Sequence, residues 1–192
     1  MRDAVQSDFE KLNQQHFGRM LLFPIVLSAL LISISFYNFL LFHTLAELFA
    51  IAVSVIMLSV AWQTYSFSRN AFLMFLACGY FWVGMMDLTH ALVYKGMNIF
   101  PDTDANPPTQ LWIAARYSQV LILLTAPVFL GRELNYKSLF IAFGAIAFTF
   151  QVMIFKGWFP DAFIEGSGLT DFKIVSEYFV SRRPFPYGAQ QD

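Results

Sequence analysis

The segment that decides the fold is Ala71–Val93, which reads AFLMFLACGYFWVGMMDLTHALV. Its length exceeds the roughly 20 apolar residues that an α-helix needs to cross the hydrocarbon core of a bilayer. Asp87 and His90 interrupt its otherwise apolar character. The segment therefore predicts a transmembrane helix that carries two polar side chains into the membrane.

Four other segments share this composition. Two of them have no charged residue, and each of the other two has one, Glu47 or Arg116. The four segments are Met20–Phe42, Leu45–Phe67, Leu111–Leu130 and Ser138–Phe155. Only 13% of the residues in the chain are charged, whereas soluble domains average roughly 25%. The sequence therefore predicts an all-α fold, a polytopic transmembrane helical bundle with five full spans.

The two ends of the chain are more polar. Residues 1–19 form a lead-in, and residues 182–192 form a tail. The first span is too long for the apolar region of a signal peptide and no small-residue cleavage site follows it, so we expect an uncleaved anchor. Residues 172–181 begin like a sixth span but stop at about half the length that a span needs. We therefore expect a membrane domain over residues 20–181 that ends in a partial sixth helix and is truncated.

Lys and Arg residues favour one orientation of this bundle. They gather before the first span and in the second and fourth connections, while the other connections are poorer in cations. These residues are Arg2, Lys11, Arg19, Arg69, Arg132 and Lys137. Because cytoplasmic loops carry an excess of Lys and Arg, we expect the N-terminus in the cytoplasm. The connections that follow odd-numbered spans then lie outside.

Composition and motifs exclude several classes of function. The net charge of −1 gives no basic footprint for nucleic acid. Cys78 is the only cysteine and lies within a span, so the sequence has neither a disulfide framework nor a CxxC redox pair. No nucleophile elbow, HExxH motif or P-loop occurs in the sequence. We therefore expect the chain not to be an enzyme.

The few ionisable residues of the spans fall at one depth. His43 and Glu47 are four residues apart, and Asp87 and His90 are three apart, so each pair shares one face of a helix. In the predicted orientation these four residues and Arg116 all lie in the outer third of the membrane. A charge at such a depth is costly unless it is paired or faces a cavity. We therefore expect these side chains to face one another.

Two interpretations of this cluster differ in kind. A single ion pair between Arg116 and Asp87 or Glu47 would be a structural element that fixes helix register. The number of converging groups, which also include Tyr94 and Gln110, instead favours a ligand-binding pocket. We expect Arg116 to pair with Asp87, the deeper carboxylate, which leaves Glu47 beside the histidines to face the ligand.

A metal or haem site is the alternative. His43 with Glu47, and Asp87 with His90, have spacings that suit a transition metal, and either histidine could be an axial ligand of haem. His43 and His90 are therefore the candidate metal ligands. Isolated histidines near a helix end are more often hydrogen-bonded interfacial groups, so a ligand pocket is the preferred hypothesis and the cofactor stays unknown.

Three stretches of the sequence resemble a known family. They are FHTLAELFAI (residues 42–51), DLTHALVYKGMNIFPDTDANPPTQLWIAARY (87–117) and FPDAFIEGSGLTDFKIVSEY (159–178). They are similar to the membrane-associated sensor domain of the third type, one of the MASE families. The similarity runs from about Leu40 to Tyr178. Proteins with such domains are bacterial signalling proteins, which implies a place in the bacterial inner membrane.

The resemblance implies a sensory function. In such proteins the membrane part precedes cytoplasmic output modules such as histidine kinase, PAS or GGDEF diguanylate cyclase domains. The signature residues that it implies are His43, Glu47, Asp87, His90, Tyr94, Lys95, Gly96, Pro101, Asn106, Gln110, Trp112, Arg116, Glu165, Lys173 and Glu177. The resemblance supplies no ligand.

The expected pocket opens to the outer face. It is formed by the second, third and fourth spans and by loops 95–110 and 156–172, and Lys173 and Glu177 close it. Its expected ligand-binding residues are His43, Glu47, Asp87, His90, Tyr94, Gln110, Trp112, Arg116, Glu165, Lys173 and Glu177. The expected partners are the lipid bilayer, an unidentified small molecule, and a second copy of the chain or a separate output protein.

The predicted orientation can be tested with introduced cysteines. Because Asp102 and Asp161 lie in outer connections of the predicted topology, a cysteine at either position should react with a membrane-impermeant thiol reagent in intact cells. Labelling of the purified protein provides the measurement of full reactivity. Protection of both positions in intact cells would reverse the orientation.

Overall fold

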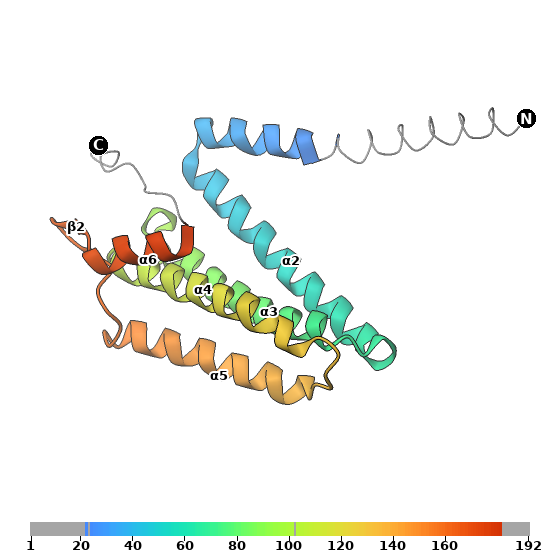
Figure 1. Ribbon diagram of the computed structural model, residues 1–192. Helices are drawn as coiled ribbons and strands as arrows, with labels where there is room; N and C mark the ends of the chain where they lie inside the picture. Colours follow the sequence, from blue (N-terminus) through green and yellow to red (C-terminus); the bar gives the residue numbers. More distant parts are fainter. Residues whose placement is uncertain (1–21, 23, 102, 182–192) are drawn as a thin grey trace, which may run out of the picture. The chain divides into compact units, whose positions relative to one another are not determined.

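The computed structural model describes residues 22, 24–101 and 103–181 (Figure 1). The chain divides into two compact units, Met1–Ala46 and Glu47–Asp192. The polar lead-in over residues 1–19 and the tail over 182–192 lie outside the described residues. Within the described part, four helices are long and apolar enough to cross a membrane. The prediction of an all-α, polytopic membrane protein is confirmed, whereas the number of five full spans is not.

The predicted first span is interrupted at Asn38. An apolar helix covers Pro24–Tyr37 and is shorter than a full span, and helix α2 begins at Phe39. The Asn38 side chain accepts a hydrogen bond from the backbone N–H of Leu41 at 3.0 Å. An asparagine in this position caps a new helix, which explains why the apolar run does not continue as one element. The part of this segment before residue 22 lies outside the described residues.

The four candidate spans follow one another in antiparallel order. They are α2 (Phe39–Ser68), α3 (Ala71–Val93), α4 (Asn106–Thr125) with its continuation η2 (Ala126–Phe129), and α5 (Tyr136–Phe155). The second unit contains α2 from Glu47 onward. The predicted segment 71–93 coincides with α3, and the predicted second, fourth and fifth spans overlap α2, α4 with η2, and α5.

Short connections place the helix ends. Arg69 joins α2 to α3 with a φ of 47°, a left-handed conformation that costs a non-glycine residue roughly 1–2 kcal/mol. Asn70 then caps α3 by accepting a hydrogen bond from the N–H of Leu73. Asn135 caps α5 in the same way, through the N–H of Ser138. These caps satisfy backbone donors that would otherwise have no acceptor at the start of each helix.

The other end of the bundle carries two longer connections. Between α3 and α4 lies the short helix η1 (Lys95–Met97). After α5 the chain forms a two-stranded antiparallel hairpin, β1 (Phe163–Ile164) with β2 (Gly168–Leu169). Helix α6 (Asp171–Ser181) follows and has 11 residues, which corresponds to the partial sixth helix.

Helix α3 is the centre of the second unit. It packs against α4 and α5, and α4 also contacts α6 (Figure 1). In the most apolar 18-residue stretch of α3, 56% of the residues are buried, whereas the corresponding share in the other three spans is 11–33%. Glycine lets α5 approach α3 closely, because a Cβ added at Gly144 would lie 2.7 Å from the Trp82 ring. The Trp82 indole N–H also donates to the Phe140 carbonyl at 2.9 Å, which holds the ring against α5.

The contact at Gly144 makes a testable prediction. Gly144→Ala should lower the thermal stability of the purified protein, since overpacking typically costs about 1–3 kcal/mol. The indole would have to move and lose its hydrogen bond to Phe140. In a Trp82→Phe background the same change should cost less, because the part of the ring that obstructs the Cβ is gone. Equal losses in the two backgrounds would contradict this packing.

Candidate functional site

An ion pair joins α3 and α4 within the spans. Arg116 Nη2 donates to both carboxylate oxygens of Asp87, at 2.6 Å from Oδ1 and 2.5 Å from Oδ2. The Asp87 side chain is 6% exposed and the Arg116 side chain 24%. An unpaired carboxylate at such a position would be costly, so Arg116 compensates the charge of Asp87. The predicted pairing of these two residues is confirmed.

The guanidinium extends this pair into a short polar chain. Arg116 Nη1 donates to Gln119 Oε1 at 2.8 Å, and Gln119 Nε2 donates to the Tyr80 hydroxyl at 3.4 Å. The arginine is therefore held from two sides, and its buried Nε–H has no acceptor among the described residues.

His90 is fixed against the start of α4. Its Nδ1 lies 2.8 Å from the carbonyl oxygen of Pro108. Because a carbonyl oxygen can only accept, Nδ1 carries a hydrogen. In a neutral imidazole Nε2 is then the atom that accepts a hydrogen bond or binds a metal. A possible ligand atom of Glu47 on α2 lies within 4.8 Å of one on His90, so the structure brings these two predicted residues together.

His43 lies one helical turn before Glu47 on α2. In a continuous helix these two side chains project from the same face. The boundary between the two compact units falls between the two residues. Only the geometry of α2 therefore relates His43 to the other site residues, and its role as a ligand stays a prediction.

Gln110 attaches the loop after α5 to α4. Its side chain is almost fully buried, and Nε2 donates to the carbonyl oxygens of Phe159 at 3.1 Å and Pro160 at 2.9 Å. Both hydrogens of the amide are used in this way. Gln110, predicted as a ligand-binding residue, therefore holds the loop over the start of α4.

Asn106 makes a second attachment of the same loop. Its Nδ2 donates to Asp161 Oδ1 at 2.8 Å, and its Oδ1 accepts from the backbone N–H groups of Ala162 at 2.8 Å and Phe163 at 3.1 Å. One side chain thus satisfies two backbone donors that precede the hairpin. The loop is ordered by its bonds to the first turn of α4.

Lys173 fastens α6 to α4. Its Nζ lies 3.0 Å from Glu177 Oε1 and 3.6 Å from the centre of the Trp112 ring, a cation–π contact. The Lys173 side chain is 8% exposed. Burial lowers the pKa of Lys173 from its ordinary value, while the hydrogen bond and the negative charge of Glu177 act in the opposite direction. These three predicted residues form one contact between two helices.

Glu165 and Tyr94 have different surroundings. Glu165 lies 3.3 Å from Lys95, and both side chains are more than half exposed, so this pair contributes little to stability. Tyr94 is half-buried, with its ring 6.0 Å from that of His90. The structure therefore places Tyr94 beside the polar groups of α3 and leaves Glu165 at the surface.

Comparison with known families identifies the class of protein. A family model for the MASE3 membrane-associated sensor domain matches residues 34–182. The chain belongs to the MASE3 family. The resemblance drawn from the three sequence stretches is thereby confirmed. Membership supports a membrane sensory input function and suggests that the MASE3 domain itself is not catalytic. No match was found among curated proteins or among solved structures.

Sequence reasoning missed Gln119 and Tyr80 in this MASE3 domain. Gln119 follows Arg116 by three residues, and Tyr80 precedes Asp87 by seven, so helical spacing places each on the same face as one member of the ion pair. Neither side chain carries a charge, and the sequence argument followed the charged side chains and histidines within the spans. A search along the helix face of Arg116 would have found Gln119.

The ion pair makes a testable prediction. Arg116→Leu should strongly lower the thermal stability of the purified protein, since breaking a buried pair costs about 3–5 kcal/mol. Adding Asp87→Asn should recover part of the loss, because the stranded carboxylate is removed. Arg116→Lys should be intermediate, since lysine keeps the charge but not the planar arrangement of donors.

Glu47→Gln provides the matched control for that recovery. Combined with Arg116→Leu it should restore less stability than Asp87→Asn does, because Asp87 is the carboxylate that Arg116 contacts. If Glu47→Gln restored more, Glu47 would be the partner that matters for stability.

Proposed function

We propose that this MASE3 domain is the sensory input part of a bacterial inner-membrane signalling protein. It binds a small polar molecule at an outward-facing site around Glu47, Asp87, His90 and Arg116. The observation that carries the proposal is the Asp87–Arg116 ion pair, which lies between two spans and has polar neighbours on both helices. Ionisable groups within spans are functional by default.

The arrangement of donors supports a ligand-binding role. A structural ion pair needs only Asp87 and Arg116. The site also contains Glu47 and His90, which each offer a possible ligand atom, and these two atoms lie within 4.8 Å of each other. Arg116 also has a buried Nε–H that no described residue accepts. A ligand with a carboxylate, carbonyl or hydroxyl oxygen would complete the hydrogen bonding of Arg116.

The proposal places the site beneath ordered chain. Gln110 and Asn106 hold the loop after α5 on the start of α4, and Lys173 holds α6 on the same helix. In this proposal the loop and α6 act as a cover, which would exclude water and strengthen the polar contacts beneath it. Release of the cover would give a ligand access from the outer side.

A ligand acts as a signal only if it binds two packings of the helices with different affinities. We propose that the two packings differ in the pairing of Arg116, with Asp87 in one and with Glu47 or the ligand in the other. The change would pass along α4 or α5 toward the cytoplasmic side. There it would reach an output module such as a histidine kinase or a GGDEF diguanylate cyclase, in the same protein or in a partner, or a second copy of the chain.

A thermal-shift screen tests this proposal. The purified protein is heated with a defined panel of small carboxylic acids, amino acids, amines and sugars. At least one compound should raise the melting temperature of the wild-type protein by several degrees and leave that of the Asp87→Asn variant unchanged. Arg132→Gln, which removes an exposed cation outside the site, is the control and should respond like the wild type. A panel that shifts wild type and Asp87→Asn equally would refute a site at the ion pair.

A metal or haem site is the second candidate function. Two observations favour it. Possible ligand atoms of Glu47 and His90 lie within 4.8 Å of each other. The Pro108 carbonyl accepts the hydrogen of His90 Nδ1, which leaves Nε2 as the nitrogen that can bind a metal. A visible absorption spectrum and metal analysis of the purified protein separate the two candidates. A stoichiometric haem band or metal content that is lost in His90→Ala would replace the ligand-sensor proposal by this one.

A further inference from the structure

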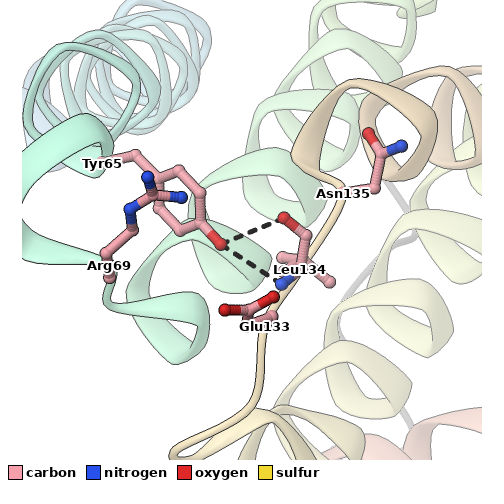
Figure 2. Close-up of a pocket in the computed structure, with 5 residues that line it drawn as sticks. All are labelled: Tyr65, Arg69, Glu133, Leu134 and Asn135. Atoms are coloured by element: carbon pink, nitrogen blue, oxygen red, sulfur yellow. Dashed lines mark hydrogen bonds between the residues drawn. The ribbon is translucent and has the colours of Figure 1, made fainter.

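A cavity lies at the end of the bundle where α2 passes into α3 and α4 passes into α5. It has a volume of about 530 Å³ and is lined by Tyr65, Arg69, Glu133, Leu134 and Asn135 (Figure 2). This volume falls within the range of roughly 300–1,000 Å³ that is usual for small-molecule sites. His90 and the start of α4 lie at the opposite ends of their helices, so this cavity is separate from the proposed sensory site.

Hydrogen bonds between the Tyr65 side chain and the Leu134 backbone join the two segments that line the cavity. The Tyr65 hydroxyl donates to the Leu134 carbonyl at 3.0 Å and accepts from the Leu134 N–H at 3.3 Å (Figure 2). The Tyr65 ring also packs against Tyr136, with ring centres 5.0 Å apart. These contacts tie the end of α2 to the connection before α5, so the charged residues on the two segments face a preformed space.

The cavity presents one cation, one anion and one neutral donor. Within the described part of the chain, neither the Arg69 nor the Glu133 side chain makes an ion pair or a hydrogen bond. Asn135 uses its side-chain oxygen to cap α5 at Ser138, which leaves its NH₂ group as a donor. Arg69 adopts a left-handed conformation at a position where glycine is ordinarily favoured. A non-glycine residue kept in such a conformation is a reason to look for a function of its side chain.

We infer that this cavity binds the headgroup of a zwitterionic phospholipid with a primary ammonium group, as in phosphatidylethanolamine. The phosphate is bound by the Arg69 guanidinium, which matches its oxygens with two donors, and by the Asn135 amide. The ammonium donates its hydrogen bonds to the Glu133 carboxylate. The separate cation and anion of the cavity thus correspond to the two charges of one headgroup.

The position of the cavity favours a lipid over a soluble molecule with the same charges. It lies where spans end, at the level at which headgroups meet the protein. Exposed apolar side chains lie close in sequence to its two charged residues. Phe67, in the last turn of α2 two residues before Arg69, is 76% exposed, and Leu130, three residues before Glu133, is 64% exposed. These surfaces offer contact to the acyl chains of a lipid whose headgroup occupies the cavity.

Native mass spectrometry of the purified full chain tests the inference. The probes are dioctanoyl phosphatidylethanolamine, phosphatidylcholine and phosphatidylglycerol with the same chains, and phosphoethanolamine without chains. Phosphatidylethanolamine should bind one per chain and roughly tenfold more tightly than the other three probes. Phosphatidylcholine lacks the N–H donors, phosphatidylglycerol lacks the cation, and phosphoethanolamine lacks the chains.

Variants assign the binding to the cavity. Arg69→Gln should remove the preference for phosphatidylethanolamine, and Glu133→Gln should reduce its binding to the level of phosphatidylcholine. Arg69→Gly, which also removes the unfavourable left-handed side chain, should fold and show the same loss. Arg132→Gln is the matched control, an exposed cation of the same connection outside the cavity lining, and should bind as the wild type does.

Three results would overturn the inference. Equal binding of the three lipids would show that no headgroup is recognised. An Arg132→Gln loss as large as that of Arg69→Gln would assign the effect to general surface charge. Binding of phosphoethanolamine as tight as that of the lipid would exclude a lipid as the source of the headgroup.

Discussion

The constraint on which this structure depends is the need to neutralise a carboxylate inside a membrane-spanning helix. Asp87 lies on α3, the most buried helix of the bundle, and Arg116 on α4 supplies the charge that makes this position tolerable. The pair fixes where α4 lies along α3, because a shift by one turn, about 5.4 Å, would separate the two groups. The apolar contacts of both helices are then set in one register. Hydrophobic surfaces alone would not select that register, because lipid tails are as apolar as the side chains.

The two ends of the bundle are stabilised by different means. Where α2 meets the connection before α5, a buried tyrosine hydroxyl bonds to backbone, and rings of Trp62 and Tyr136 pack edge to face beside it at 4.8 Å. At the other end, polar side chains of α4 satisfy the backbone of an irregular loop. The first end combines aromatic packing with one buried hydroxyl, whereas the second depends mainly on hydrogen bonds to a loop that a polar ligand or water can replace. The second end is therefore the one suited to change in response to a signal.

Most of the fold could be predicted from hydropathy, because the length and composition of an apolar segment predict whether it spans the membrane and at what depth each of its residues lies. The segment 71–93 was predicted to the residue, and the Asp87–Arg116 pair followed from comparing depths. Hydropathy does not specify how a helix is rotated, so the contact between Tyr65 and Leu134, which are 69 residues apart in sequence, could not be predicted. The interruption at Asn38 was missed for another reason. A single capping side chain ends one helix and starts the next without changing the average hydropathy of the segment.

The attachment of the loop after α5 to the first turns of α4 has a mechanical consequence. Asn106, which holds the loop, and Arg116 are ten residues apart on one helix, a separation of about 15 Å along its axis. A helix is stiff over that length, so a displacement at Asn106 becomes a comparable displacement at Arg116. A displacement of the loop is thus transmitted along α4 to the ion pair, and it can separate Arg116 from Asp87. Motion outside the membrane could in this way alter the electrostatics within it with no moving part besides α4.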